Sequence, residues 1–207
     1  MRDGDRVKNI EMPWNHNYAY NRWIARAIGN RGRILDVGCG NGTLALFLRT
    51  GDNYILGIDP SASAVQRASE ANKYSNVDFM QTDFESFEAS GKKFDAIIFV
   101  ASLHHMDMRA AIAKAKSLLK KNGILIIVGL AKPSSLVDWI VEAARVIPSK
   151  IVSAVKKNVT SEELDIEVSY DLPTMGEVRR ICGEHLSGHK IRYGLHYRYL
   201  LTWESGL

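Results

Sequence analysis

A glycine-rich segment at residues 36–42, with the sequence DVGCGNG, is the part of this chain best suited to binding a ligand. It follows an apolar stretch typical of a strand and precedes one typical of a helix. Glycines let the backbone pass close to a ligand, and the N–H groups at a helix N-terminus face it. The alternative is a tight turn between a strand and a helix that holds no ligand. We favour a ligand site.

Asp36 restricts which ligand this segment would hold. Thr43 stands where the nucleotide fingerprint G-x-G-x-x-G has its third glycine, so the pattern of dinucleotide oxidoreductases is incomplete. A carboxylate before the glycines would also repel a pyrophosphate, whereas it would attract an ammonium or sulfonium group. The sequence therefore indicates a cationic ligand, with a nicotinamide-dependent oxidoreductase as the alternative in another enzyme class.

Alternating segments between residues 15 and 130 must position this turn. Short apolar segments alternate with segments in which apolar residues recur at helical spacing, which is typical of βαβ units and predicts a parallel sheet. We expect five strands, over residues 33–37, 54–58, 77–81, 96–100 and 123–128. The residues that follow these strands should meet at one edge of the sheet, where ligands bind in such folds.

The C-terminal part of the chain follows a different pattern. Thr174 and Glu177 have capping-box spacing, which predicts a last helix. Aromatic and β-branched residues dominate 189–193 and 197–203, with Gly194 between them, which predicts a terminal β-hairpin.

The sequence resembles the class I S-adenosylmethionine-dependent methyltransferases, whose first motif is matched by residues 36–42. In that family an acid that ends the second strand holds both ribose hydroxyls, and Asp59 matches it. An acid after the third strand receives the adenine amino group, and Asp83 matches it, with the backbone N–H and ring of Phe84 presented to adenine. The resemblance implies S-adenosyl-L-methionine as cofactor. The residues it assigns to cofactor binding are Asp36, Gly38, Cys39, Gly40, Asn41, Asp59, Pro60, Asp83, Phe84 and Ala101.

The resemblance also implies the fold. We expect an α/β protein with a Rossmann-like, doubly wound, mostly parallel sheet and a C-terminal antiparallel hairpin. Residues 1–207 should form a single methyltransferase domain.

The loop after the fourth strand flanks the methionine part of the cofactor in this family and faces the methyl acceptor. The N-terminal residues 14–23 are similar to the opening segment of bacterial small-molecule methyltransferases, which closes over the cofactor. The substrate pocket is therefore assigned to Trp14, His16, Leu103 and His104.

The paired histidines His104 and His105 allow two interpretations. Either one acts as a general base, because imidazole titrates near neutral pH, or the pair positions the loop. No catalytic residue is assigned. No third metal ligand is evident beside them, so no metal site is expected.

The expected function is methyl transfer to an oxygen, nitrogen or carbon nucleophile of a small-molecule acceptor. A catalytically inactive cofactor-binding interaction module and an RNA methyltransferase are the alternatives. The lysines and arginines behind the net charge of +4 are scattered, and no RNA-binding module or Asn-Pro-Pro-Tyr-type motif is seen. We therefore expect no nucleic-acid partner.

Residues 131–172 interrupt the alternation and predict a helical insertion that leaves the sheet at its carboxyl edge, in the position of a lid. Residues 134–157 combine an apolar stripe with several cations, which suits capping an apolar acceptor or peripheral contact with an anionic membrane surface. The alternative is that the stripe completes the core.

The sequence shows neither a membrane-spanning segment nor a secretory signal, and this bears on the expected cellular location. The apolar runs are shorter than the roughly 20 residues of a membrane-spanning helix. The N-terminus lacks an apolar stretch like that of a secretory signal, and two cysteines suit a reducing compartment. We expect a cytoplasmic protein.

Overall fold

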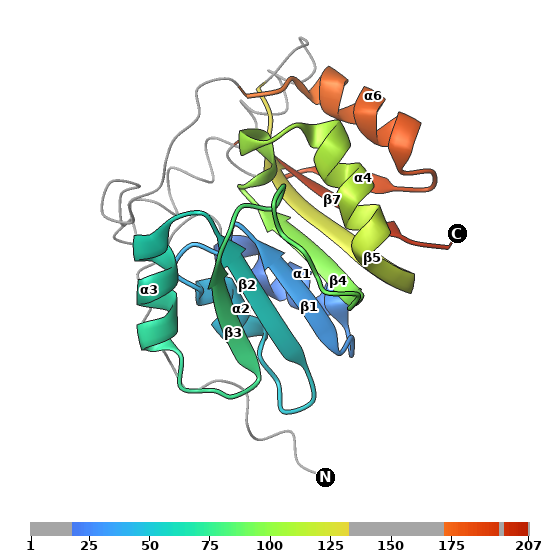
Figure 1. Cartoon of the computed structure of the whole chain (residues 1–207). Coiled ribbons are helices and arrows are strands. Elements are labelled where there is room, and N and C mark those ends of the chain that lie inside the picture. Colours follow the sequence, from blue (N-terminus) through green and yellow to red (C-terminus); the bar gives the residue numbers. More distant parts are fainter. Residues whose placement is uncertain (1–17, 133–171, 195–196, 207) are drawn as a thin grey trace.

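The computed structural model describes residues 18–132, 172–194 and 197–206, and these form a seven-stranded sheet with helices on both faces (Figure 1). The strands are β1 (Arg33–Val37), β2 (Tyr54–Asp59), β3 (Val77–Gln81), β4 (Phe94–Val100), β5 (Leu119–Leu130), β6 (Lys190–Tyr193) and β7 (Arg198–Glu204). Their order across the sheet is β3-β2-β1-β4-β5-β7-β6. The first five strands are parallel, and β7 pairs antiparallel with both β5 and β6. The predicted fold class is confirmed.

Five helices are described, together with two 3-10 turns. They are α1 (Asn21–Ile28), α2 (Thr43–Leu48), α3 (Ala62–Ala71), α4 (Met108–Leu118) and α6 (Met175–His185), with η1 (Tyr18–Tyr20) and η2 (Leu103–His105). In Figure 1, α4 and α6 lie side by side on one face of the sheet, and α1 and α2 lie behind it. None of the helices in the described ranges is long and apolar enough to span a membrane.

Side-chain caps fix where several helices begin. Asp107 Oδ1 accepts the backbone N–H of Ala110 at 2.7 Å and starts α4. The predicted capping box is confirmed, since Thr174 Oγ1 accepts the N–H of Glu177 while the Glu177 carboxylate accepts the N–H of Thr174 at 2.8 Å. Such caps satisfy N–H groups that have no partner within the helix.

The strands agree with their predicted positions to within two residues at each end, apart from the start of β5. Strand β5 begins at Leu119, four residues before the predicted start. Residues 120–122 are polar, so the sequence pattern does not indicate a strand there. Leu119 pairs with Phe94, and the register then shifts before Ala96 pairs with Ile124. Asn122, with φ +62°, lies within this irregularity. A local bulge therefore carries the strand through residues that resemble a turn.

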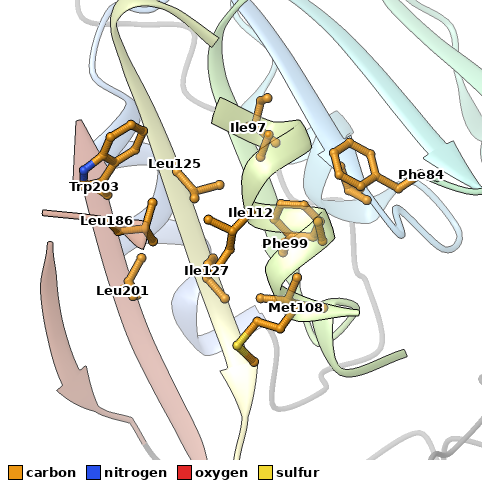
Figure 2. Packing of buried hydrophobic residues seen from close by; sticks show 14 of the residues in the cluster. Phe84, Ile97, Phe99, Met108, Ile112, Leu125, Ile127, Leu186, Leu201 and Trp203 are labelled. Atoms are coloured by element: carbon orange, nitrogen blue, oxygen red, sulfur yellow. The ribbon is translucent and has the colours of Figure 1, made fainter. Parts of the chain in front are cut away.

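The core consists of two apolar clusters, one on each face of the sheet. Figure 2 shows the cluster beneath α4, where Met108 and Ile112 of the helix lie beside Phe99 of β4 and Ile127 of β5. The other cluster joins α1 and α2 to the opposite face. Because the central parallel strands are covered on both faces, their side chains form nearly continuous apolar runs.

Close packing between β5 and β7 depends on Gly129. Gly129 pairs with Tyr199, and a Cβ at residue 129 would lie 2.2 Å from Tyr199 Cζ. We expect Gly129→Ala to lower the free energy of unfolding by about 1–3 kcal/mol, the cost of overpacking a filled core. Denaturant unfolding measures it.

The matched control for this prediction is Gly51→Ala, because a Cβ at residue 51 would meet nothing within 4 Å. Combining Gly129→Ala with Tyr199→Leu should cost less than the sum of the two single changes. Equal losses for the variants at residues 129 and 51 would contradict the packing explanation.

Some predicted features lie outside the described residues. These are Trp14, His16 and residues 133–171, which include the expected lid and the segment 134–157. The two described flanks of the insertion meet, since Lys132 N–H donates to the Pro173 carbonyl at 2.9 Å and Met175 N–H donates to the Lys132 carbonyl at 3.3 Å. Lys132 and Thr174 also form an isolated parallel bridge.

Candidate functional site

The carboxyl ends of β1 and β2 are joined by backbone hydrogen bonds that shape the glycine-rich turn. The N–H groups of Gly38 and Cys39 both donate to the Ile58 carbonyl, at 2.9 and 3.0 Å. Gly40 N–H donates to Asp59 Oδ2 at 2.8 Å. The first motif and the acid that ends β2 are therefore in direct contact, 19 residues apart in the chain.

The three glycines of the turn face different surroundings, although all have positive φ. A Cβ at Gly38 would lie 2.4 Å from Ser102 Cβ, and one at Gly42 would lie 2.5 Å from the Phe79 ring. A Cβ at Gly40 would meet nothing within 4 Å. Gly38 and Gly42 thus serve close packing, whereas Gly40 lines open space.

The loop after β4 closes against the same turn. Ser102 is buried, and its hydroxyl donates to the Val37 carbonyl at 2.6 Å. Ala101, with φ +53°, donates its N–H to the Val128 carbonyl at 2.8 Å. A positive φ costs a residue with a side chain on the order of 1–3 kcal/mol, so surrounding contacts hold this backbone in place. Sequence reasoning missed Ser102, because a lone serine after a strand carries no local signal.

Asp36 is buried in this site with one unpartnered oxygen. Its residue is 1% exposed, and its Oδ2 atom has no hydrogen-bond partner among the described residues. Burial, and secondarily the negative charge of Asp59, raises the pKa of the Asp36 carboxyl from 3.8 to about 7. A buried carboxylate without a partner is costly, so this position suits a cationic ligand.

Asp59 and Asp83 lie at the same edge of the sheet, after β2 and β3. Asp59 is half-buried, and its Oδ1 accepts the Ser61 N–H at 2.9 Å. Asp83 is exposed, and its Oδ1 accepts the Ser86 N–H at 2.7 Å, which lowers the pKa of the Asp83 carboxyl. The Asp59 carbonyl accepts the Thr82 N–H at 3.1 Å and so ties the two loops together.

Two other residues predicted for cofactor binding are placed by local contacts. Asn41 Oδ1 accepts the Thr43 hydroxyl at 2.5 Å within the turn. Pro60 is exposed beside Asp59, and its carbonyl accepts Gln81 Nε2 at 3.4 Å. Both residues therefore belong to the loops that meet at this edge.

Besides Asp36, three residues predicted for the site are buried inside the protein. The Phe84 ring packs edge to face on Phe99, with centroids 5.3 Å apart, in place of facing a ligand. Leu103 is 1% exposed and belongs to the core, so its side chain forms no open pocket wall. Burial raises the pKa of the Cys39 thiol far above its usual range, which keeps the thiol protonated.

His104 is the half-buried histidine of the loop after β4. Its ring centroid lies 4.1 Å from that of His105, and its Nδ1 has no hydrogen-bond partner among the described residues. Burial lowers the pKa of His104 to about 4, with smaller contributions from His105 and Arg198. His104 is therefore a neutral imidazole at physiological pH. Among the residues described, no three His, Cys, Asp or Glu side chains are grouped so that they could hold a metal ion.

The arrangement fits S-adenosylmethionine on two observations. Open space at Gly40 allows a ligand to approach the backbone of the turn. The unpartnered oxygen of the buried Asp36 carboxyl suits a ligand that carries a positive charge.

Comparisons with known proteins point to methyltransferases. Residues 34–123 match the family described as methyltransferase domain. An uncharacterized methyltransferase of Mycobacterium tuberculosis is 28% identical over 205 residues, a match that covers 95% of this chain and 99% of that protein. A ubiquinone biosynthesis O-methyltransferase of Rhodopseudomonas palustris is 33% identical over 102 residues, which are 47% of this chain and 40% of the relative.

A solved structure shares the fold. The N-methyltransferase NodS of Bradyrhizobium japonicum, crystallised with S-adenosyl-L-homocysteine, matches with a TM-score of 0.63 and 16% identity. The match covers 99% of this chain and 94% of NodS. The family match, the sequence relatives and the shared fold together support a class I S-adenosylmethionine-dependent methyltransferase.

Proposed function

We propose that this methyltransferase acts on a small-molecule acceptor and holds its cofactor at the edge of the sheet between Asp36 and Asp59. The observation that carries the proposal is the turn at Gly40, where open space lies against a backbone N–H bonded to Asp59. The buried Asp36 carboxyl belongs to β1, four residues before Gly40, and its Oδ2 has no hydrogen-bond partner among the described residues.

Each acid has a separate role in the proposed site. Asp59 accepts the ribose hydroxyls, since its two oxygens hold one backbone N–H each and a carboxylate has further lone pairs. Asp83 accepts the adenine amino group at the exposed end of the loop after β3. Asp36 supplies the countercharge. The bound cofactor contributes a methyl group on a positively charged sulfur, which makes that methyl reactive toward nucleophiles.

The chain's own contribution to catalysis is positioning. Holding the acceptor close and in line with the methyl group supplies much of the rate. His104, neutral above a pH of about 4, can accept a hydrogen bond or a proton from an acceptor at the loop after β4. The buried Ser102 holds this loop against β1, so the position of His104 relative to the turn is fixed.

One relative supports a small-molecule acceptor. The R. palustris protein is named as a ubiquinone biosynthesis O-methyltransferase. In this proposal the acceptor is an apolar small molecule. Peripheral membrane contact through residues 134–157 stays a prediction. An inactive cofactor-binding module and an RNA methyltransferase are the competing functions.

Transfer of radiolabelled methyl from S-adenosylmethionine to a cell extract tests the proposal. We expect the label to enter molecules that pass a filter of small molecular-weight cut-off, with nuclease treatment making no difference. The Gly40→Val protein is the inactive control. Label in RNA would support the alternative acceptor, and binding without transfer to any fraction would support the inactive module; both contradict the proposal.

Asp59→Ala should weaken binding of S-adenosylmethionine by about 1.5–3 kcal/mol, the range for hydrogen bonds to a charged group. The change removes the proposed ribose acceptor and the partner of the Gly40 N–H. Isothermal titration calorimetry measures the loss. Asp52→Ala is the matched control, because Asp52 is an exposed acid before β2, at the opposite edge of the sheet. Similar affinities for the two variants would refute the assignment.

A further inference from the structure

The buried acid Asp36 has no neutralising basic partner among the residues that the structure describes. Asp36 is 1% exposed, and its Oδ2 has no hydrogen-bond partner among the described residues. The negative charge of Asp59 further disfavours the charged form of the Asp36 carboxyl. Of the described side chains, no basic group offsets these effects on Asp36. The site therefore holds a buried acid whose charge must be balanced by a proton or by a ligand.

The two forms of the cofactor differ in charge at this site. S-adenosylmethionine carries a sulfonium, an ammonium and a carboxylate, which sum to one positive charge. S-adenosylhomocysteine lacks the sulfonium and is neutral overall. Both forms share the same adenosine and the same amino-acid end, so a difference in how Asp36 responds to them reports the sulfonium charge. Charge interactions in a buried site are weakly screened, so this difference acts over several ångströms.

We propose that Asp36 distinguishes the charged cofactor from its spent product by exchanging a proton for the sulfonium. The inference rests on the proposed function, since it assumes that the cofactor binds at Gly40 and Asp36. In the unliganded protein the carboxyl holds a proton at pH values below about 7. When S-adenosylmethionine binds, the O–H bond of Asp36 breaks, the proton passes to solvent, and the carboxylate balances the sulfonium. S-adenosylhomocysteine leaves the proton largely in place.

The direction of the pH dependence follows from the raised pKa of Asp36, about 7 in the unliganded protein. Below this pH the cofactor must displace a proton, so its affinity falls by up to about tenfold per pH unit. Above it the carboxylate is already charged, and affinity no longer depends on this group. The affinity of S-adenosylmethionine relative to S-adenosylhomocysteine therefore rises with pH up to about 7 and is then constant.

Neighbouring titratable groups do not account for the same pH dependence of cofactor affinity. Burial keeps the Cys39 thiol protonated, and His104, with a pKa of about 4, stays neutral from pH 6 to 8. Burial lowers the pKa of Arg198 of β7, and the nearby Tyr20 acts in the opposite direction. His105 is exposed in the loop after β4, and a His105→Gln protein removes its contribution.

Isothermal titration calorimetry of both ligands tests the proposal between pH 6 and 8, in buffers of different ionisation enthalpy so that released protons are counted. We expect S-adenosylmethionine to bind about tenfold more weakly at pH 6 than at pH 8 and to release close to one proton at pH 6. S-adenosylhomocysteine should change by less than about threefold and release fewer protons. His105→Gln should leave this difference intact.

Two charge variants separate Asp36 from general charge effects. Asp36→Asn should make the ratio of the two affinities independent of pH and reduce the preference for S-adenosylmethionine at pH 8. Asp52→Asn removes the same charge from an exposed position and should preserve the wild-type ratio. Because the wild-type pH series is itself a test, the proposal stays falsifiable if Asp36→Asn does not fold.

The outcomes distinguish this inference from the proposed function. If both ligands bind and Gly40→Val abolishes binding, but the two affinities change in parallel with pH, the proton exchange at Asp36 is refuted and the cofactor site stands. If neither ligand binds, or if Gly40→Val binds both as the wild type does, the proposed site is refuted together with the inference.

Discussion

Replacing Gly40 by valine should abolish measurable binding of S-adenosylmethionine while the protein remains folded. The Cβ of residue 40 would enter the open space beside the turn, and the two methyl groups would fill it. We expect a loss of about 3 kcal/mol or more, roughly a hundredfold in Kd, because the side chain and the cofactor would overlap. Calorimetric titration measures the affinity, and circular dichroism confirms the fold.

The control must separate overlap from backbone strain, because Gly40 has φ +54°. Gly91 offers this control, since it has φ +76° and a Cβ there would also meet nothing within 4 Å. It lies before β4, at the edge of the sheet away from the proposed site. Gly91→Val should lose about as much stability as Gly40→Val, on the order of 1–3 kcal/mol, yet bind the cofactor as tightly as the wild type does. Equal affinities for the two variants would show that the turn does not hold the cofactor.

Replacing Asp36 by asparagine should stabilise the unliganded protein at neutral pH. The pKa of Asp36 rises from 3.8 in the unfolded chain to about 7 in the folded protein, so the folded state binds more protons between these values. Stability contributed by this group is therefore present below a pH of about 4 and is lost as pH rises to about 7. Three pH units correspond to a loss of up to about 4 kcal/mol at neutral pH. The amide carries no charge and avoids this loss.

Denaturant unfolding of wild type and Asp36→Asn at several pH values from 4 to 8 measures this effect. The difference between the two proteins is the informative quantity, because other groups such as Asp83 and Asp95, with lowered pKa values, act on both alike. We expect the advantage of the variant to grow from pH 4 to 7 and then to level off. A difference that does not vary with pH would mean that Asp36 is solvated or partnered in the folded protein.

Much of the fold could be predicted because local patterns encode it. The apolar runs of β1 and β3 have the predicted bounds, and the capping box at Thr174 starts the last helix as predicted. The start of β5 could not be predicted in this way. Its first residues are held by pairing of Leu119 with Phe94 and by a bulge, and a polar sequence does not show either.

The sequence predicted which residue types form the candidate site, but it predicted only in part whether their side chains are buried or exposed. The resemblance to the methyltransferases assigns Asp59 to cofactor binding, and the structure brings Asp59 into contact with Gly40. Phe84 and Leu103 also follow strands, but their side chains enter the core. The sequence around them does not reveal this, because the direction of a loop side chain depends on what the loop packs against.

The sequence by itself determined the parallel strands, the acids that follow them and the glycine-rich turn, because strand periodicity and turn chemistry act over a few residues. Only the tertiary structure decided which glycine lines open space. Gly38, Gly40 and Gly42 are equivalent in the sequence, yet Ser102 fills the space at the first and Phe79 the space at the last. The same holds for Asp36, whose raised pKa arises from burial and from Asp59, a residue brought close by the pairing of β1 with β2. Solvation and long-range charge depend on neighbours in space, and the sheet sets those neighbours.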